Sequence, residues 1–253
     1  RAVELPTFIG RGGKQSMYSA RKKLAYVVNS LNPGGTEKLV VEMTLAFAAD
    51  FDISVVCLDE PGLWANELRS RGTHVACLWR QPGLDLAMPG RLAAYMRQKG
   101  AQAIHAHQST AWFYSALSRL LFSRPRLLFE EHGRFFPEIR NRKRILFNRY
   151  VTGPLTHRVV AVSEDVRTRL HDYEGLDYRR IEVVHNGVMA AVPVSEEEKA
   201  TRRRALGFHP EDFVVGTVGR MDPIKNLPLL VNSLRQAIQQ IPSVRGLLIG
   251  HGP

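Results

Sequence analysis

Two cationic residues stand five positions apart where an apolar run gives way to a helical pattern. Arg220 and Lys225 lie in the segment 219–226, directly after the apolar run 213–218. A parallel strand that ends beside a helix start favours anions, because the helix N-terminus carries partial positive charge and strand ends line the ligand crevice. An Arg fork and a Lys point charge can share phosphate oxygens. The segment therefore predicts a diphosphate site, with a solvated turn as the alternative.

His132 lies just beyond another apolar run, in the sequence Glu130-Glu131-His132-Gly133. An imidazole at the carboxyl end of a strand can donate a hydrogen bond to a phosphate or to a sugar hydroxyl. The flanking carboxylates are expected to raise its pKa toward the charged form. A purely structural histidine is the alternative, and a general-base role is not expected.

His105 and His107 are two residues apart, so their imidazoles share one face of a strand end. Two imidazoles on one face could bind a metal ion. No third ligand stands at a recognisable spacing, so we favour structural or acceptor-side histidines and predict that the protein holds no metal.

Gly34 and Gly35 follow the first apolar run and precede the first helical pattern. Glycines at such a turn let backbone N–H groups approach an anionic ligand, although an ordinary strand-to-helix turn is the alternative. The spacing differs from the dinucleotide fingerprint GxGxxG, and no acidic residue closes the next strand in the ribose-binding manner. A nicotinamide enzyme is therefore disfavoured.

A basic and aromatic segment spans Arg134 to Tyr150. On a helix, Ile139, Leu146, Phe147 and Tyr150 would share a face, while much of the positive charge would lie elsewhere. The segment predicts either a core-packed helix with a solvated basic face or a helix that docks on anionic lipid or on a phosphorylated, lipid-linked acceptor.

Apolar runs of four to eight residues alternate with longer amphipathic segments from Lys23 onward, as in a parallel sheet with helices on both faces. The expected strands span 24–30, 53–58, 74–78, 103–106, 126–129, 159–162 and 181–184. The expected helices between them include 36–49, 64–71, 89–99 and 110–122. Right-handed crossovers then predict an α/β, doubly wound, Rossmann-like domain over residues 23–192.

The pattern breaks near residues 190–194, and Ser195 with Glu198 three residues later forms a predicted capping box. A helix, a strand over 213–218, a helix over about 227–240 and a strand over 246–249 follow. We interpret 193–253 as the beginning of a second Rossmann-like domain, with too few strands for a usual sheet. Residues 1–22 lack periodicity and are expected to be a flexible leader.

The composition disfavours several classes of protein. The chain has 253 residues, of which 44% are hydrophobic, a formal net charge of +11, and two cysteines, Cys57 and Cys77, both in apolar runs. A disulfide framework is not expected, and no apolar run is long enough to span a bilayer. We expect a cytoplasmic protein that attracts phosphorylated ligands or an anionic membrane face. No known nucleic-acid-binding fingerprint supports a nucleic-acid partner.

Five motifs occur in order, each at the end of a strand-like run: NPGGTEK at 32–38, EHG at 131–133, AVSE at 161–164, VHNGV at 184–188 and GRMDPIKN at 219–226. Together they resemble the retaining, nucleotide-sugar-dependent glycosyltransferases of family 4, which have the two-domain GT-B architecture. The resemblance covers residues 23–253. It implies transfer of a sugar from a nucleoside diphosphate donor to a saccharide or lipid-linked acceptor, such as a growing polysaccharide or a lipopolysaccharide core, with no metal or other cofactor.

The resemblance also implies roles for the chemical residues. Arg220 and Lys225 would bind the donor diphosphate and stabilise charge on the leaving group. His132 would contact the donor sugar, and Gly34 and Gly35 would lie beside the sugar and phosphates. The first domain would supply the acceptor surface, and the second would hold the nucleotide.

The motifs around Ser163 and Asn186 are turn and helix-cap chemistry on any fold. The resemblance places both near the interdomain cleft, with Asn186 at the donor site and at the approach to the linker. The sequence does not define their chemical role.

The chain departs from the family pattern near its end. Members carry two glutamates separated by seven residues that contact the donor sugar and ribose, and these are expected beyond Pro253. His251 replaces the acidic residue of the common Gly-Asp-Gly-Pro turn. We therefore expect a fragment that is inactive on its own.

Two other functions remain open at the level of sequence. A sugar-nucleotide epimerase has the same GT-B architecture but would release a modified sugar nucleotide without an acceptor. A non-catalytic module would bind polyanions without discriminating nucleotide diphosphates. Product analysis and binding selectivity distinguish these two from a transferase.

Overall fold

The computed structural model describes residues 21–133, 139–188, 192–250 and 252. These residues form two compact units, one that ends at Gly187 and one that begins at Val188. Residues 1–20 of the predicted leader lie outside the described residues, and the first strand already begins at Lys22.

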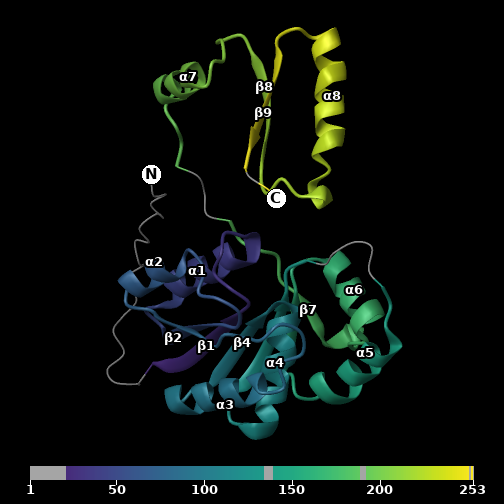
Figure 1. Cartoon of the computed structure of the whole chain (residues 1–253). Coiled ribbons are helices and arrows are strands. Elements are labelled where there is room, and N and C mark those ends of the chain that lie inside the picture. The colour runs from purple at the N-terminus through teal and green to yellow at the C-terminus, as the bar shows by residue number, and fades with distance from the viewer. Residues whose placement is uncertain (1–20, 134–138, 189–191, 251, 253) are drawn as a thin grey trace. The chain divides into compact units, whose positions relative to one another are not determined.

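The first unit contains a parallel sheet of seven strands in the order β3-β2-β1-β4-β5-β6-β7 (Figure 1). This order begins as in the Rossmann fold, with the chain winding outward in both directions from the centre. The register pairs Val27 of β1 with Val56 of β2 and with Ala106 of β4. The strands are β1 (Lys22–Val28), β2 (Phe51–Cys57), β3 (His74–Cys77), β4 (Ala103–His107), β5 (Arg126–Glu131), β6 (Arg158–Ala161) and β7 (Ile181–Val183).

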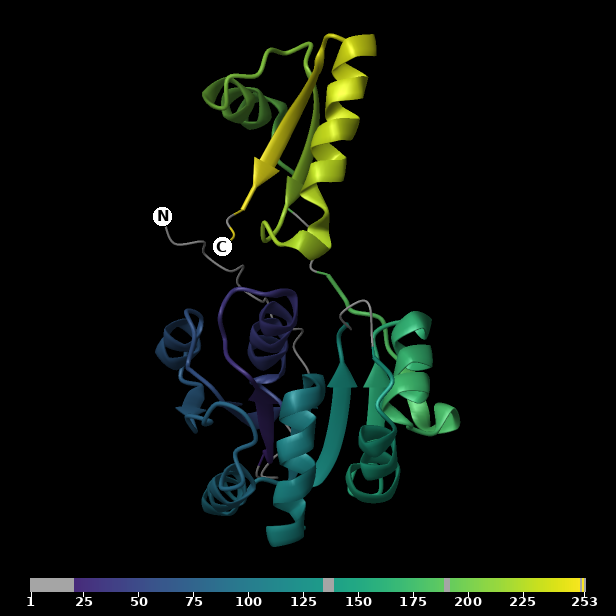
Figure 2. The same ribbon diagram turned by 45° about the vertical axis from the view of Figure 1, so that its right-hand side comes forward.

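Helices connect these strands and cover both faces of the sheet, and α4 lies over β4 and β5 (Figure 2). They are α1 (Gly35–Phe47), α2 (Ala65–Ser70), α3 (Met88–Lys99), α4 (Gln108–Leu121), α5 (Arg142–Phe147), the π-helical turn η1 (Asn148–Thr152), α6 (Glu164–Glu174) and the 3-10 turn η2 (Tyr178–Arg180). Within the described ranges, no helix combines the length and apolar character needed to cross a lipid bilayer.

Alternation along the strands produces two hydrophobic cores. In β1, Ala25 and Val27 face a core that includes side chains of α3, α4 and α6, while Tyr26 and Val28 face a core that includes α1 and α2. Successive side chains of a strand point to opposite faces, so a central parallel strand must be apolar on both sides. The apolar runs of the sequence reflect this double burial.

The predicted α/β fold is confirmed, and each of the seven expected strands is present with ends shifted by at most a few residues.

The prediction for 134–150 is wrong in part. The helix begins only at Arg142, residues 134–138 lie outside the described residues, and Ile139, Leu146 and Tyr150 are exposed. Phe147 alone of the expected apolar face contacts an aromatic side chain of α4, Phe113. The segment is therefore not the fully core-packed helix that its apolar residues suggested.

The second unit contains the parallel pair β8 (Phe213–Val218) and β9 (Val244–Ile249), with α7 (Glu196–Ala205), the 3-10 turn η3 (Pro223–Lys225) and α8 (Leu227–Gln240). Helix α8 packs against β9 through Leu234, which is buried close to Gly246. The predicted N-cap of α7 is present, because the Ser195 hydroxyl accepts from the backbone N–H of Glu198.

We expect Leu92→Ala to lower the free energy of unfolding of the first unit by about 2–5 kcal/mol, because Leu92 of α3 is fully buried and its truncation leaves a cavity. Trp64, Trp79 and Trp112 all lie in the first unit, so tryptophan fluorescence during urea unfolding reports this unit. Leu86→Ala is the control, since Leu86 is 82% exposed, and it should change the free energy by less than about 0.5 kcal/mol. Equal effects of the two variants would contradict the assigned core.

Candidate functional site

The carboxyl ends of β1, β4 and β5 meet at one edge of the central sheet. The chain winds toward β2 and β3 from β1, and toward β5, β6 and β7 from β4, so its direction reverses between these two neighbours. In open α/β sheets the ligand crevice lies outside the strand ends at such a switch point. The residues that follow β1, β4 and β5 are therefore the first candidates for a ligand site.

Gln108 follows β4 at this switch point and was not singled out from the sequence. Its Nε2 donates to Oγ1 of Thr36 at 3.1 Å, and its Oε1 accepts from Nδ2 of Asn29 at 3.4 Å. Its φ of 70° lies in the left-handed region, which is uncommon for a residue other than glycine and frequent at functional sites. The side chain thus fastens the end of β1 and the start of α1 to β4. The sequence around Gln108 does not indicate this role, because the role depends on the strained backbone.

Gly34 and Gly35 lie where predicted, as the N-cap and first residue of α1. A Cβ on Gly34 would lie 2.2 Å from a carboxylate oxygen of Glu37, whereas nothing lies within 4 Å of a Cβ on Gly35. The loop therefore has close contact on one side and open space on the other. An anion at Gly34 requires the Glu37 side chain to turn aside, because like charges so close repel each other.

The sheet register brings three imidazoles and a carboxylate together at the ends of β4 and β5. His107 is paired with Glu130 in the register, and its Nδ1 lies 2.9 Å from Nε2 of His132. His105 Nε2 lies 2.8 Å from Oε2 of Glu130. The same oxygen lies 3.7 Å from His107 Nδ1 and 4.0 Å from His132 Nε2. Sequence reasoning selected His132 but missed its contact with His107, because the two belong to neighbouring strands.

Burial decides the protonation of this cluster. It lowers the pKa of His132, and the smaller attraction of Glu130 does not reverse this, so the expectation of a raised pKa is wrong. The pKa of the fully buried His107 is lowered further by burial and by the neighbouring imidazoles. Burial alone would raise the pKa of Glu130, but the hydrogen bond from His105 and the nearby imidazoles lower it below its ordinary value. At neutral pH, Glu130 is charged while His107 and His132 are neutral.

Glu130 also supplies the third potential metal ligand that the sequence did not reveal. Ligand atoms of His105, His107 and Glu130 all lie within 4.8 Å of one another. A metal must lie near the plane of each imidazole ring that binds it, about 2.0–2.1 Å from the nitrogen for zinc. The rings of His105 and His107 are tilted, with centroids 4.1 Å apart and planes 31° apart. The absence of a metal at these three residues stays a prediction.

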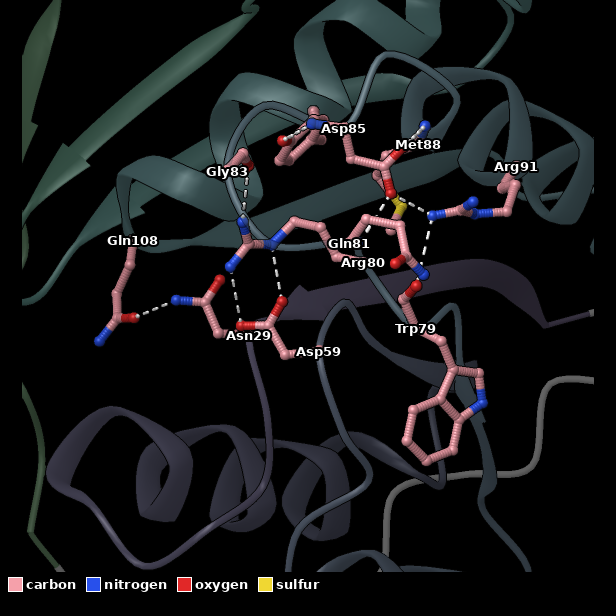
Figure 3. Close-up of polar contacts among 11 residues, drawn as sticks. Asn29, Asp59, Trp79, Arg80, Gln81, Gly83, Asp85, Met88, Arg91 and Gln108 are labelled. Atoms are coloured by element: carbon pink, nitrogen blue, oxygen red, sulfur yellow. Dashed lines mark hydrogen bonds and ion pairs between the residues drawn. The ribbon is translucent and has the colours of Figure 1, made fainter.

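A second polar network lies beside this edge, on the loop between β3 and α3 (Figure 3). The Arg80 guanidinium forms a bidentate ion pair with Asp59, at 2.6 Å and 3.2 Å, and donates to the backbone oxygen of Gly83. Asp85 accepts from the backbone N–H groups of Gln81, Ala87 and Met88 and pairs with Arg91. The hydrogen bond from Gln81 is the largest cause that lowers the pKa of the Asp85 carboxyl. The loop is thereby held in one conformation over the strand ends.

This loop and the first turns of α4 line an open surface hollow of about 320 Å³, a size suited to a small organic ligand. Its walls combine hydroxyl groups, aromatic rings and one guanidinium whose charge Asp59 already balances. Such a lining favours a ligand rich in hydroxyl groups. The lining residues are Arg80, Gly83, Leu84, Ser109, Thr110, Phe113 and Tyr114.

In the second unit, Arg220 and Lys225 line one small hollow at the end of β8. Asp222 begins the 3-10 turn η3, since its carboxylate accepts from the backbone N–H of Ile224 and its backbone oxygen accepts from that of Lys225. The turn returns Lys225 toward Gly219, where a Cβ would lie 4.0 Å from Cε of the lysine. Arg220 is 63% exposed at its side chain and lies 3.9 Å from Asp222. The two cations therefore line the same hollow, and both side chains are exposed.

The loop after β9 completes this second hollow. Gly250 has a φ of 152°, and a Cβ there would lie 1.9 Å from the backbone oxygen of Gly219. Only glycine fits so close an approach, because any side chain would push the two loops apart. The loops that follow β8 and β9 are therefore in direct backbone contact at Gly219 and Gly250.

Ser163 and Asn186 behave differently. The Ser163 hydroxyl accepts from the backbone N–H of Val166 and caps α6, which confirms its cap chemistry. Asn186 is exposed after β7, and its side chain has no hydrogen-bond partner among the described residues. His185 beside it contacts the backbone oxygen of Val162 through Nδ1. The donor-site role of Asn186 stays a prediction.

A family model described as Glycosyltransferase Family 4 matches residues 33–192. The chain belongs to this family. The match covers the strand ends that carry Gly34, Gly35, His132 and Asn186. Membership favours a transferase over the epimerase and over the non-catalytic module that the sequence left open.

Individual relatives match more distantly. D-inositol 3-phosphate glycosyltransferase of Mycobacteroides abscessus is 34% identical over 96 residues, which are 38% of this chain and 20% of that protein. EpsF of Bacillus subtilis, named a glycosyltransferase, is 22% identical over 94% of this chain and 64% of its own length. The crystal structure of HepE from Anabaena in complex with UDP and glucose superposes with a TM-score of 0.72 at 22% identity, over 92% of this chain and 62% of HepE. The chain thus spans less than two thirds of these proteins, and the structural likeness shows a shared GT-B fold.

The buried imidazoles predict acid destabilisation of the first unit. The pKa of His107 in the folded chain lies below its ordinary value of about 6.5, so the unfolded chain takes up a proton first as the pH falls. At a pH above this ordinary pKa, His107 should not change the free energy of unfolding. At a lower pH, the free energy of unfolding should fall by about 1.4 kcal/mol per pH unit until His107 also becomes protonated in the folded chain.

His107→Phe should therefore reduce the difference in unfolding free energy between pH 7.5 and pH 5.5, as measured by urea unfolding with tryptophan fluorescence. The value at pH 7.5 gives each protein its own baseline, so an overall change in stability does not interfere. A pH dependence identical to that of the unsubstituted chain would contradict the assignment of a buried neutral imidazole.

Proposed function

We propose that the protein to which this chain belongs transfers a sugar from a nucleoside diphosphate donor, with UDP as the nucleotide, and retains the anomeric configuration. The observation that carries the proposal is the placement of Arg220 and Lys225 around one hollow at the end of β8. HepE, which shares the fold, was crystallised with UDP and glucose. Family membership supports the same reaction class.

Electrostatics supplies the mechanism of these two residues. Departure of the nucleotide places negative charge on the diphosphate as its bond to the anomeric carbon breaks. An Arg fork and a Lys ammonium stabilise that charge more strongly in the transition state than in the ground state, which accelerates the reaction. Both side chains come from the segment between β8 and α8, where Asp222 caps the 3-10 turn η3 that carries Lys225.

The first unit supplies the other half of the reaction in this proposal. His132, directly after β5, is the residue that contacts the donor sugar. The loop at Gly34 and Gly35 lies beside that sugar and its phosphates. The hollow lined by Ser109, Thr110 and Tyr114 suits a hydroxyl-bearing acceptor, because its one described cation is neutralised by Asp59. A saccharide end of a growing polysaccharide, a lipopolysaccharide core or a lipid-linked saccharide fits this chemistry.

We also propose that the described part of the segment Arg134 to Tyr150 contacts an anionic membrane face. Leu146 is 53% exposed and Tyr150, four residues later, is 70% exposed. The exposed Arg142, Lys143 and Arg149 lie on the same segment. Exposed apolar side chains with basic neighbours bind the interface of anionic bilayers. Such contact would bring a lipid-linked acceptor to a cytoplasmic enzyme.

Arg220→Ala and Lys225→Ala, each in the full-length protein, should reduce sugar transfer by roughly 100- to 1,000-fold, the usual effect of removing one charge-stabilising donor. Each should also weaken UDP binding in calorimetric titration, with little change in unfolding temperature, because both side chains are exposed. Arg235→Ala on α8 is the matched control, since it removes an exposed arginine away from the hollow, and it should retain transfer and UDP binding. Full activity in both site variants refutes the assignment.

Flotation with liposomes tests the membrane contact. The chain should float with vesicles of phosphatidylglycerol and not with vesicles of phosphatidylcholine, and Leu146→Ser with Tyr150→Ser should reduce flotation at least several-fold. The control pair Leu63→Ser and Leu86→Ser removes exposed apolar side chains elsewhere and should float normally. Equal flotation with both kinds of vesicle, or an equal loss of flotation in both pairs of substitutions, would contradict the proposed membrane contact of this segment.

A further inference from the structure

The contact between His107 and His132 determines which nitrogen of His132 carries its proton. Their side chains are 0% and 5% exposed, and Nδ1 of His107 lies 2.9 Å from Nε2 of His132. Both imidazoles come from the same edge of the sheet, one at the end of β4 and one directly after β5. The register fixes their approach, because His107 is paired with Glu130, two residues before His132.

Both imidazoles are neutral in the folded chain, and a neutral imidazole has one N–H and one bare nitrogen. A hydrogen bond between them therefore has two forms. In the first, His107 donates from Nδ1 and His132 carries its own proton on Nδ1. In the second, His132 donates from Nε2 and His107 carries its own proton on Nε2.

Each form leaves one N–H without a partner, and the two forms differ in where it lies. Nε2 of His107 and Nδ1 of His132 are both buried and have no hydrogen-bond partner among the described residues. An N–H left without a partner costs more than a bare nitrogen, and orphaned buried N–H groups are rare. The second form would place it on His107, whose side chain is fully buried. The first places it on His132, at the strand ends where a ligand binds.

Glu130 favours the same form. Its Oε2 lies 3.7 Å from Nδ1 of His107 and 4.0 Å from Nε2 of His132, and a carboxylate attracts the nearer N–H. His105 holds that oxygen in place through its own contact at 2.8 Å. The carboxylate therefore stabilises a proton on His107 Nδ1.

We propose that His107 is a positioning residue that donates from Nδ1 to His132 and holds His132 as the Nδ1–H tautomer, with that N–H reserved for an oxygen of the donor sugar. The last clause rests on the proposed function. Among the residues that the structure describes, this donor has no partner, as expected of a group that a ligand satisfies. His107 itself does not touch the reacting atoms.

Long-range nitrogen–proton correlation spectra of the ¹⁵N-labelled 253-residue chain read the tautomer directly. We expect His132 to show a pyrrole-like shift at Nδ1 and a pyridine-like shift at Nε2, with the same pattern for His107. The opposite pattern at His132, or an averaged one, overturns the proposal. This reading does not depend on turnover, so a correct tautomer with no sugar transfer would refute the proposed function alone.

Variants test whether His107 imposes the tautomer. His107→Phe keeps a ring of similar size but removes the donor, so the His132 pattern should change to an averaged or Nε2–H form. His107→Asn retains an N–H near the position of Nδ1 and should restore the Nδ1–H form at His132. The control His105→Gln keeps a donor toward Glu130 and should leave the tautomer unchanged. An unchanged His132 pattern in His107→Phe overturns the role of His107.

Kinetics of the full-length protein give the second readout. His107→Phe should lower kcat/KM for the donor by about tenfold, equivalent to about 1.4 kcal/mol, while the KM for the acceptor stays the same. His107→Asn should recover most of this loss. If His107→Phe folds poorly, the tautomer of the unsubstituted chain and the Asn variant still decide the question.

Discussion

The reversal of winding between β1 and β4 is the constraint on which the first unit depends. Right-handed crossovers place α1 and α2 on one face and α3, α4 and α6 on the other, so β1 and β4 become neighbours while the segments that follow them diverge. The carboxyl ends of these strands therefore open a crevice instead of being covered by a connecting helix. Gln108 spans this crevice and ties its two sides together through Asn29 and Thr36.

Burial of polar groups at the strand ends has a free-energy cost, and this protein meets that cost in two ways. Around Arg80 and Asp85, ion pairs and backbone hydrogen bonds pair both carboxylates, although Nε of Arg91 is buried without a hydrogen-bond partner within the described ranges. Around His107 and His132, Nε2 of His107 and Nδ1 of His132 are likewise buried and have no hydrogen-bond partner there. Fully satisfied networks give rigidity, whereas unsatisfied buried groups indicate function.

In the second unit, a short turn brings two cations together. A short 3-10 turn after β8 returns the chain so that two cations five residues apart face one hollow, and Asp222 caps that turn. Gly250 permits the loop after β9 to approach Gly219, because any larger residue would separate the strand ends. Positive charge is therefore concentrated by backbone geometry and remains open to solvent, where it can exchange water for phosphate oxygens.

The fold class, the positions of the seven strands and the placement of Arg220 and Lys225 after a strand could all be predicted from the sequence. Doubly buried strands require continuous apolar runs, and a strand-to-helix corner is a local feature of the chain, so both are visible along one sequence. The tertiary structure alone decided which groups meet. The contacts of Glu130 with His105 and of His132 with His107 join the neighbouring strands β4 and β5, whose pairing no spacing reveals. The hydrogen bond from Gln108 to Thr36 joins the starts of α4 and α1. It also reversed the expected pKa shift of His132, since sequence shows the flanking carboxylates but not the burial that outweighs them.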